Sequence, residues 1–379
     1  MADTMESVDF ALTEAQEMLR QTTRQFLADR VPKDVVRAVS ETGGGFDKKL
    51  WQAGAELGWH SLAIPEEYGG AGYTFAELSI VLEELGRALF PGPFLPTVVM
   101  AADAILSVGT EEQKQAHLPS IAMGDHTVAV ALSEGPTAVG AEDINTSAEL
   151  SGDGWVMSGR KTNVVFGHTA DTFLVAARSA GGTSLFLVPS DSAGVNVEVV
   201  PTLDATTKQA TVTFADVRVA PAGLLGVEGG ADPVVERMLR LAGVALALDQ
   251  VGGAQWCLET AVEHGKTRFQ FGRAIGSFQA IKHRCADMLV AVEHARSTAY
   301  HAARVTDHPD ELSIAAPLAK SMCSDAYLQA AGETIQILGG TGFTWEHDIH
   351  LYFKRAKSSA LMFGDARYQR RLLADQLGL

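Results

Sequence analysis

The sequence predicts an α+β protein of three parts: an N-terminal α-helical domain (residues 1–123), a middle antiparallel β domain (124–230) and a C-terminal four-helix bundle (231–379). Apolar residues recur at helical spacing in the first and last parts and alternate with polar residues in the middle. The length of 379 residues allows two or three domains, each with its own core. A composition of 46% apolar and 20% charged residues excludes global disorder.

The N-terminal part contains clear helix signals. Thr13 and Gln16 have the spacing of a capping box, and amphipathic helices are expected near Asp47–Leu57 and from Ala76 to Phe90, where three prolines follow. The glycines at 69, 70 and 72 do not follow a strand in the GxGxxG order. A dinucleotide-binding fingerprint is therefore not expected there.

The middle part consists of short β-branched runs separated by Gly, Asp and Pro, which is typical of strands. Six or seven such strands within about 100 residues favour a closed barrel or a sandwich. The runs are HTVAVALSE, WVMSGRKTNVVF, DTFLVAAR, TSLFLVPS, VNVEVV and ATVTFADVRVA.

Helical periodicity returns at Asp232 and continues to the end of the chain. Helices are expected near 232–270, 276–306, 311–338 and 347–375, lengths that suit a four-helix bundle.

Charge and composition exclude several classes of function. The net charge of −16 disfavours nucleic acid as a partner, because an acidic surface repels phosphates. No run of about 18 apolar residues and no signal peptide is present, so we expect a cytoplasmic protein without a membrane partner. The three cysteines have no metal-binding spacing and are expected to be free thiols.

Four colinear segments resemble the acyl-CoA dehydrogenase family. They are LWQAGAELGWHSLAIPEEYGGAG (50–72), GTEEQKQAHLPSIAMGD (109–125), RFQFGRAIGSFQAIKHRCADM (268–288) and QILGGTGFTWEHDIHLYFKRAK (336–357). The resemblance implies a flavoprotein that uses FAD to desaturate an acyl-CoA. It also implies an oligomer and an electron-transfer flavoprotein as electron acceptor.

The last two segments resemble the flavin-binding segments of the family. An Arg fork suits a pyrophosphate, Phe offers a flat face, Gln can bond a nucleotide edge, and glycine lets a ligand approach the backbone. Each residue type alone is more often a surface, core or turn residue. The resemblance implies that a neighbouring subunit's FAD places its ADP on Arg268, Gln270, Phe271, Phe278, Gln279, Gln336, Gly339 and Gly340.

The catalytic half of the resemblance is incomplete. The family removes the α-proton of a thioester with a Glu at one of two positions, which align with Phe363 and Ala242, and neither residue can accept a proton. The family's flavin-facing hydroxyl is retained at Ser133, but its next aromatic and Thr positions hold Asn163 and Val165. We therefore expect one subunit of a heteromeric enzyme for bulky acyl-CoA thioesters, whose partner subunit supplies the base.

Three alternatives remain open from the sequence. Asp365, two residues beyond the usual base, could serve as the base of a self-sufficient homotetramer, although Asp before such a segment is most often a helix N-cap. The fold also includes flavin-dependent monooxygenases, which need no α-carbon base. A structural subunit without flavin is the third alternative.

Overall fold

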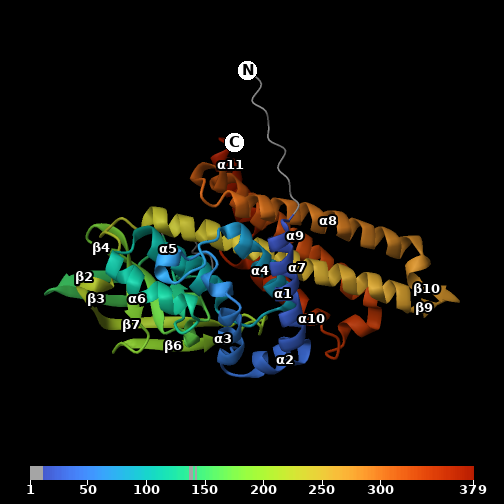
Figure 1. Ribbon diagram of the computed structural model, residues 1–379, viewed down its shortest axis with the longest axis horizontal. Coiled ribbons are helices and arrows are strands. Elements are labelled where there is room, and N and C mark those ends of the chain that lie inside the picture. The colour runs from blue at the N-terminus through green and yellow to red at the C-terminus, as the bar shows by residue number, and fades with distance from the viewer. Residues whose placement is uncertain (1–11, 136–139, 141–142) are drawn as a thin grey trace, which may run out of the picture.

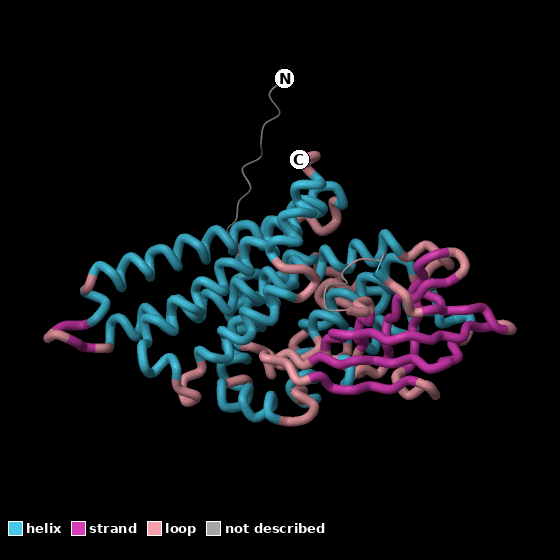
Figure 2. The backbone as a smooth tube through the Cα atoms, turned by 180° about the vertical axis from the view of Figure 1, so that it is seen from behind, coloured by secondary structure: helices cyan, strands magenta, loops and turns pink. Residues whose placement is uncertain are grey.

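The computed structural model describes residues 12–135, 140 and 143–379, and it has the three expected parts in the expected order (Figure 1). The sheet lies at one end of an elongated molecule, and the long C-terminal helices extend to the other end (Figure 2). In the described part of the chain, no helix is both long and apolar enough to cross a membrane.

The N-terminal part is helical, as predicted. Thr13 and Gln16 form the capping box that begins the first helix. The expected break after Phe90 is short, because Pro96 lies in the first turn of a π-helix, where its missing N–H costs no hydrogen bond. The helices are α1 (Glu14–Arg30), α2 (Lys33–Glu41), α3 (Lys48–Glu56), α4 (Phe75–Ala88), the π-helix η3 (Leu95–Ala101), α5 (Ala102–Val108) and α6 (Glu111–Ala122).

The middle part is the expected β domain with mostly antiparallel pairs, but it is a mixed sheet and not the closed barrel offered as one alternative, because β1 and β2 pair with β4 in parallel. Its order is β6-β7-β3-β2-β4-β5-β8, and in the described chain the end strands β6 and β8 do not pair with each other. β1 runs parallel to β4, because the β2–β3 hairpin separates these strands and no tight turn joins them. The strands are β1 (Val128–Ala131), β2 (Ser147–Ser151), β3 (Gly154–Val165), β4 (Thr172–Ser179), β5 (Gly182–Pro189), β6 (Val195–Val200), β7 (Gln209–Val219) and β8 (Leu224–Leu225).

The C-terminal part is built around three long helices. The predicted helix over 347–375 is in fact two helices, because Phe363 (φ +54°) and Gly364 (φ +93°) adopt left-handed conformations that end helical geometry. The elements are α7 (Asp232–Thr267), the hairpin β9 (Phe269–Gln270) and β10 (Arg273–Ala274), α8 (Gln279–Arg304), α9 (Pro309–Leu338), the 3-10 segment η8 (Gly339–Phe343), α10 (Ile349–Leu361) and α11 (Ala366–Gln376).

The N-terminal helices and the bundle share one core, because α4 packs closely on α7. A Cβ at Gly252 would lie 1.9 Å from the carbonyl oxygen of Glu83, and a Cβ at Gly86 would lie 2.1 Å from that of Asp249. Only glycine permits this backbone approach. The contact fixes α7, which lines both cavities described below, against the N-terminal domain.

Candidate active site

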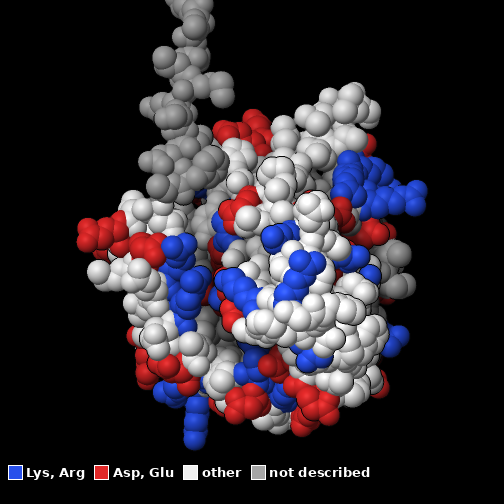
Figure 3. All heavy atoms as spheres, turned by 90° about the vertical axis from the view of Figure 1, so that its right-hand side faces the viewer, with Lys and Arg blue, Asp and Glu red and all other residues white. Residues whose placement is uncertain are grey.

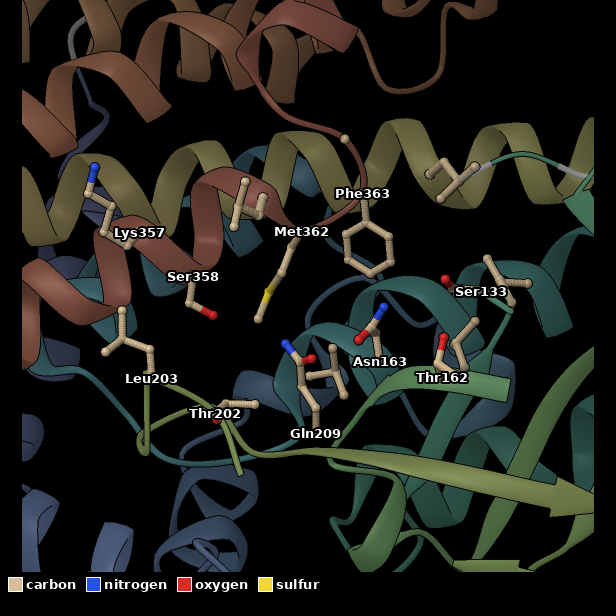
Figure 4. A pocket seen from close by; sticks show the side chains of 16 residues that line it. Ser133, Thr162, Asn163, Thr202, Leu203, Gln209, Lys357, Ser358, Met362 and Phe363 are labelled. Carbon is tan, nitrogen blue, oxygen red and sulfur yellow. The ribbon is translucent and has the colours of Figure 1, made fainter. Parts of the chain in front are cut away.

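A cavity of about 370 Å³ lies between the sheet and the end of α10. The strand β3 shifts register between Lys161 and Val164, and Asn163 within this bulge has a φ of +55°. Figure 4 shows Asn163 on β3 facing Met362 and Phe363 of the loop after α10. The cavity is lined by Val130, Leu132, Ser133, Thr162, Asn163, Val165, Thr202, Leu203, Gln209, Leu239, Lys357, Ser358, Leu361, Met362, Phe363 and Gly364. We call it the central cavity.

A buried ion pair holds the edge of the central cavity next to Ser133. Lys161 has no exposed surface and donates to Glu134 Oε1 (2.6 Å) and to the carbonyl oxygen of Leu132 (3.1 Å). Burial lowers the pKa of Lys161 to about 8, although Glu134 opposes the shift. Hydrogen bonds from Lys161 and from the backbone N–H of Thr146, against the opposing effect of burial, lower the pKa of Glu134 to about 2. The paired Glu134 thus anchors the segment that carries Ser133, whose hydroxyl donates to the carbonyl oxygen of Gly135 (2.9 Å).

Neither family base position carries a proton acceptor in the folded chain. The Phe363 ring projects from the α10–α11 loop into the central cavity (Figure 4). Ala242 is fully buried in α7, within the core. Among the described residues, no Asp, Glu or His lines the central cavity. The carboxylate that the family uses as base is therefore absent from the described lining, in which the titratable side chain is Lys357.

A second cavity of about 490 Å³ lies beside the central cavity, between β4–β5 and helices α7, α9 and α11. Leu239 and Phe363 line both cavities. The acids in its lining are Asp232 and Glu236, and Glu236 forms an ion pair with Arg240 one helical turn away. We call it the side cavity.

Asp365 lines neither cavity. Its carboxylate caps α11 by accepting the backbone N–H of Tyr368 at 2.8 Å, and the residue is exposed. The structure therefore shows the N-cap arrangement that the sequence offered as the alternative to catalysis.

The predicted ADP-binding residues gather at the far end of the bundle. Phe271 is 91% exposed at the tip of the β9–β10 hairpin, with its ring edge-on to Phe278 at 6.2 Å. Thr267 and Leu338 line one surface hollow, so the residues that follow them, Arg268 and Gly339, belong to neighbouring surface. The backbone N–H of Arg268 donates to His264, and no described side chain pairs with its exposed guanidinium. Gln270, Gln279 and Gln336 are also exposed at this end.

This surface fits an anionic nucleotide better than it fits an interior packing role. Gly339 needs to be glycine because its φ is +61°. Gly340 has no such conformation, and a Cβ there would meet no atom within 4 Å. Packing within the chain therefore does not require glycine at position 340, where the backbone is open. Figure 3 faces this end and shows several Lys and Arg side chains, although the chain as a whole has a net charge of −16.

The predicted ADP-binding residues and Leu239 of the central cavity lie toward opposite ends of α7. Leu239 lines the central cavity and Thr267 precedes the hairpin, and both belong to the continuous helix α7. At a rise of 1.5 Å per residue, the helix spans about 42 Å from Leu239 to Thr267.

Sequence reasoning missed several polar residues that line the central cavity. Thr202 lies in the loop after β6, Gln209 begins β7 and Ser358 lies in α10, and only tertiary structure brings them together. It also missed Arg355, which is buried between the Asp204 and Asp249 carboxylates at 2.9 and 3.0 Å. This triad joins the β domain to α7 and α10.

The three parts of the chain match the family models described as acyl-CoA dehydrogenase N-terminal domain (residues 13–125), middle domain (129–217) and C-terminal domain (230–378). The chain thus belongs to the acyl-CoA dehydrogenase family, a family of FAD-dependent oxidoreductases.

Individual relatives agree with this assignment. The chain is 35% identical to acyl-CoA dehydrogenase IpdE2 of Mycolicibacterium smegmatis over 96% of this chain and 98% of the relative. A chain of the ChsE4-ChsE5 complex from Mycobacterium tuberculosis superposes with a TM-score of 0.90 at 30% identity, covering 98% of this chain and 99% of that one. A chain of Tcur3481-Tcur3483, described as a steroid ACAD, has a TM-score of 0.87 at 32% identity, with 96% and 98% covered.

Proposed function

We propose that this chain is one subunit of a heteromeric acyl-CoA dehydrogenase that desaturates bulky acyl-CoA thioesters, such as intermediates of sterol side-chain or ring degradation. In this proposal the partner chain supplies the catalytic base, the flavin pocket and the substrate site. This chain supplies the surface for the ADP end of the partner's FAD.

One observation carries the proposal: the described lining of the central cavity contains no Asp, Glu or His. Desaturation removes an α-proton and a β-hydride, and bound FAD supplies the hydride acceptor. The α-proton needs a base within hydrogen-bond reach of the α-carbon. Phe363 presents a hydrocarbon ring and Ala242 is buried, so this chain cannot perform the proton transfer at either position.

The retained half of the site supports an FAD shared between chains. Arg268 offers a planar fork of donors to a pyrophosphate, and Gln270, Gln279 and Gln336 offer amides to a nucleotide edge. Phe271 and Phe278 present rings, while Gly339 and Gly340 leave the backbone accessible. Ser133, which lines this chain's own central cavity, retains the hydroxyl of the family's flavin-facing position.

The relatives support a heteromeric enzyme and a bulky substrate. One similar structure is a complex of two differently named chains, ChsE4 and ChsE5, and another pairs Tcur3481 with Tcur3483 as a steroid ACAD. By analogy, we propose a second acyl-CoA dehydrogenase-like chain as partner, an electron-transfer flavoprotein as acceptor, and the cytoplasm as location.

The test is to purify the tagged chain from its own cells, with any bound partner, and separately to purify it alone. We expect a second acyl-CoA dehydrogenase-like chain in equal amount, turnover of a sterol side-chain acyl-CoA by the complex, and none by the lone chain. Asp365→Asn and Glu236→Gln in this chain should leave the turnover of the complex unchanged. Full FAD occupancy and turnover by the lone chain would refute the proposal and support the self-sufficient homotetramer.

A further inference from the structure

We infer that Arg37 of the N-terminal helix α2 is a positioning residue for the nucleotide-binding surface, because it holds the segment that follows Gly340. This inference rests on the proposed function, since it assumes that Gly339 and Gly340 meet the ADP end of FAD. It assigns the N-terminal domain a role in cofactor binding that its distance along the chain would not suggest.

Arg37 bonds to three residues of the connection between η8 and α10. Its Nε and Nη2 both lie 2.8 Å from Asp348 Oδ1, and its Nη1 donates to the carbonyl oxygen of Trp345 at 2.8 Å. Nη2 also reaches the carbonyl oxygen of Glu346 at 3.5 Å. A guanidinium can fix a carboxylate and neighbouring carbonyls together because its donors form a rigid planar fork.

The other contacts of this connection are local. Thr344 bonds back to the carbonyl oxygen of Thr341, and Nδ1 of His347 accepts the backbone N–H of Ile349. Nε2 of His350 lies 3.3 Å from the carbonyl oxygen of Trp345. These bonds shape the turn but do not attach it to another part of the protein. Among the described residues, the hydrogen bonds that tie it to the N-terminal helices come from Arg37.

Between the buried residues Gly342 and Ile349, most of the connection is exposed. Phe343 is 82% exposed and Trp345 is 69% exposed, so hydrophobic burial contributes little to holding their backbone. Arg37 and Asp348 are each about 70% shielded, with side-chain exposures of 28% and 29%. Their ion pair is therefore less screened than a fully exposed pair.

A second residue of α2, Lys33, fixes the position of the helix that carries Arg37. Lys33, one helical turn earlier, donates to the carbonyl oxygen of Ala88 at 2.8 Å and lies 5.2 Å from the ring centroid of Tyr352 on α10. α2 is thus attached to both α4 and α10. A group that binds a ligand must be held by rigid neighbours to keep its geometry, and α2 provides that support to the segment after Gly340.

The test measures binding of ADP and FAD to the full-length chain and to its native complex. Arg37→Met should weaken ADP binding in titration calorimetry by about tenfold, the loss expected for a charge-assisted bond to the supporting segment. The native complex should lose FAD on gel filtration, whereas kcat at saturating FAD should stay within about twofold of wild type. Arg37→Lys should recover only part of the affinity, because an ammonium can pair with Asp348 but cannot reach the carbonyl oxygens as well.

Arg20→Met is the matched control, because Arg20 pairs with Glu17 within exposed helix α1 of the same domain. It should leave ADP affinity unchanged. If Arg37→Met lowers the melting temperature but binds ADP as wild type does, Arg37 is merely structural and the inference is wrong. If the wild-type chain and its native complex bind neither ADP nor FAD, the proposed function itself fails.

Discussion

Leu239 of α7 and Phe363 of the α10–α11 loop form the wall shared by the central cavity and the side cavity. Phe363 holds its place through a left-handed backbone conformation (φ +54°), and the adjoining Gly364 continues the turn. The wall stands at the position where the family has a carboxylate. The loop thus presents a hydrocarbon ring at the position that aligns with that carboxylate.

Asp365 provides the sharpest test of catalytic acids near this wall. Because its carboxylate accepts the N–H of Tyr368, Asp365→Ala should lower the free energy of unfolding by about 1 kcal/mol. Asp365→Asn should lose much less, since Asn is also a good N-cap. Both variants should retain the turnover of the complex, measured with an artificial electron acceptor. A loss of 100-fold or more in Asp365→Asn, on the order of what a general base contributes, would show that Asp365 is the base.

Arg268 tests the nucleotide-binding surface. Its exposed guanidinium has no described partner, so Arg268→Gln should cost little stability but should weaken FAD binding by about 10- to 100-fold, the loss expected for charged hydrogen bonds. The measurement is a fluorescence titration of the apo-complex with FAD. Arg371→Met removes the same charge from α11 and should change nothing. Equal affinities of wild type and Arg268→Gln would remove Arg268 from the site.

Arg355 tests the junction between the β domain and the bundle. In Arg355→Met the carboxylates of Asp204 and Asp249 lose their shared cation, and Asp204 stays buried. The free energy of unfolding, measured in urea, should therefore fall by about 3–5 kcal/mol. The triple variant that also carries Asp204→Asn and Asp249→Asn should recover part of this loss. A drop below about 1 kcal/mol in the single variant would mean that the triad does not join the domains.

The buried His60 should make the free energy of unfolding depend on pH. Burial against Trp51 and Phe94, with ring centroids at 4.0 and 5.4 Å, lowers its pKa to about 3. Between pH 6.5 and 3 the unfolded chain therefore binds more protons at this residue than the folded chain, and stability falls as the pH falls. From pH 6.5 to pH 5 the loss from His60 should be about 2 kcal/mol. Urea unfolding of His60→Gln should show a smaller loss over this range, and an unchanged loss would assign the effect to other groups.

Much of the fold was predictable because local signals agreed with it. The capping box at Thr13, the strand runs and the periodicity of α7 to α9 all describe what the residues do locally. The break at Gly364 was missed, since one glycine in a helical pattern is a weak signal. The parallel pairing of β1 with β4 was missed because strand direction depends on distant segments.

The candidate site shows the same difference between local and distant signals. The sequence could point to an ADP-binding surface because the proposed residues lie in two continuous segments that each have a recognisable pattern, and this assignment stays a prediction. Arg355 could not, because a lone Arg in a helix is typical of a solvated face, and its partners Asp204 and Asp249 lie 151 and 106 residues away. Arg37 reaches Asp348 across 311 residues, and no sequence pattern marks it.

Flavin reduction tests the central claim most directly. The lone chain, incubated with excess FAD, and the native complex are each mixed anaerobically with a sterol side-chain acyl-CoA, and the absorbance of oxidised flavin is followed. We expect bleaching only in the complex, because the lone chain has Phe363 and Ala242 where an α-proton acceptor is needed. Stoichiometric bleaching of the lone chain would contradict the account.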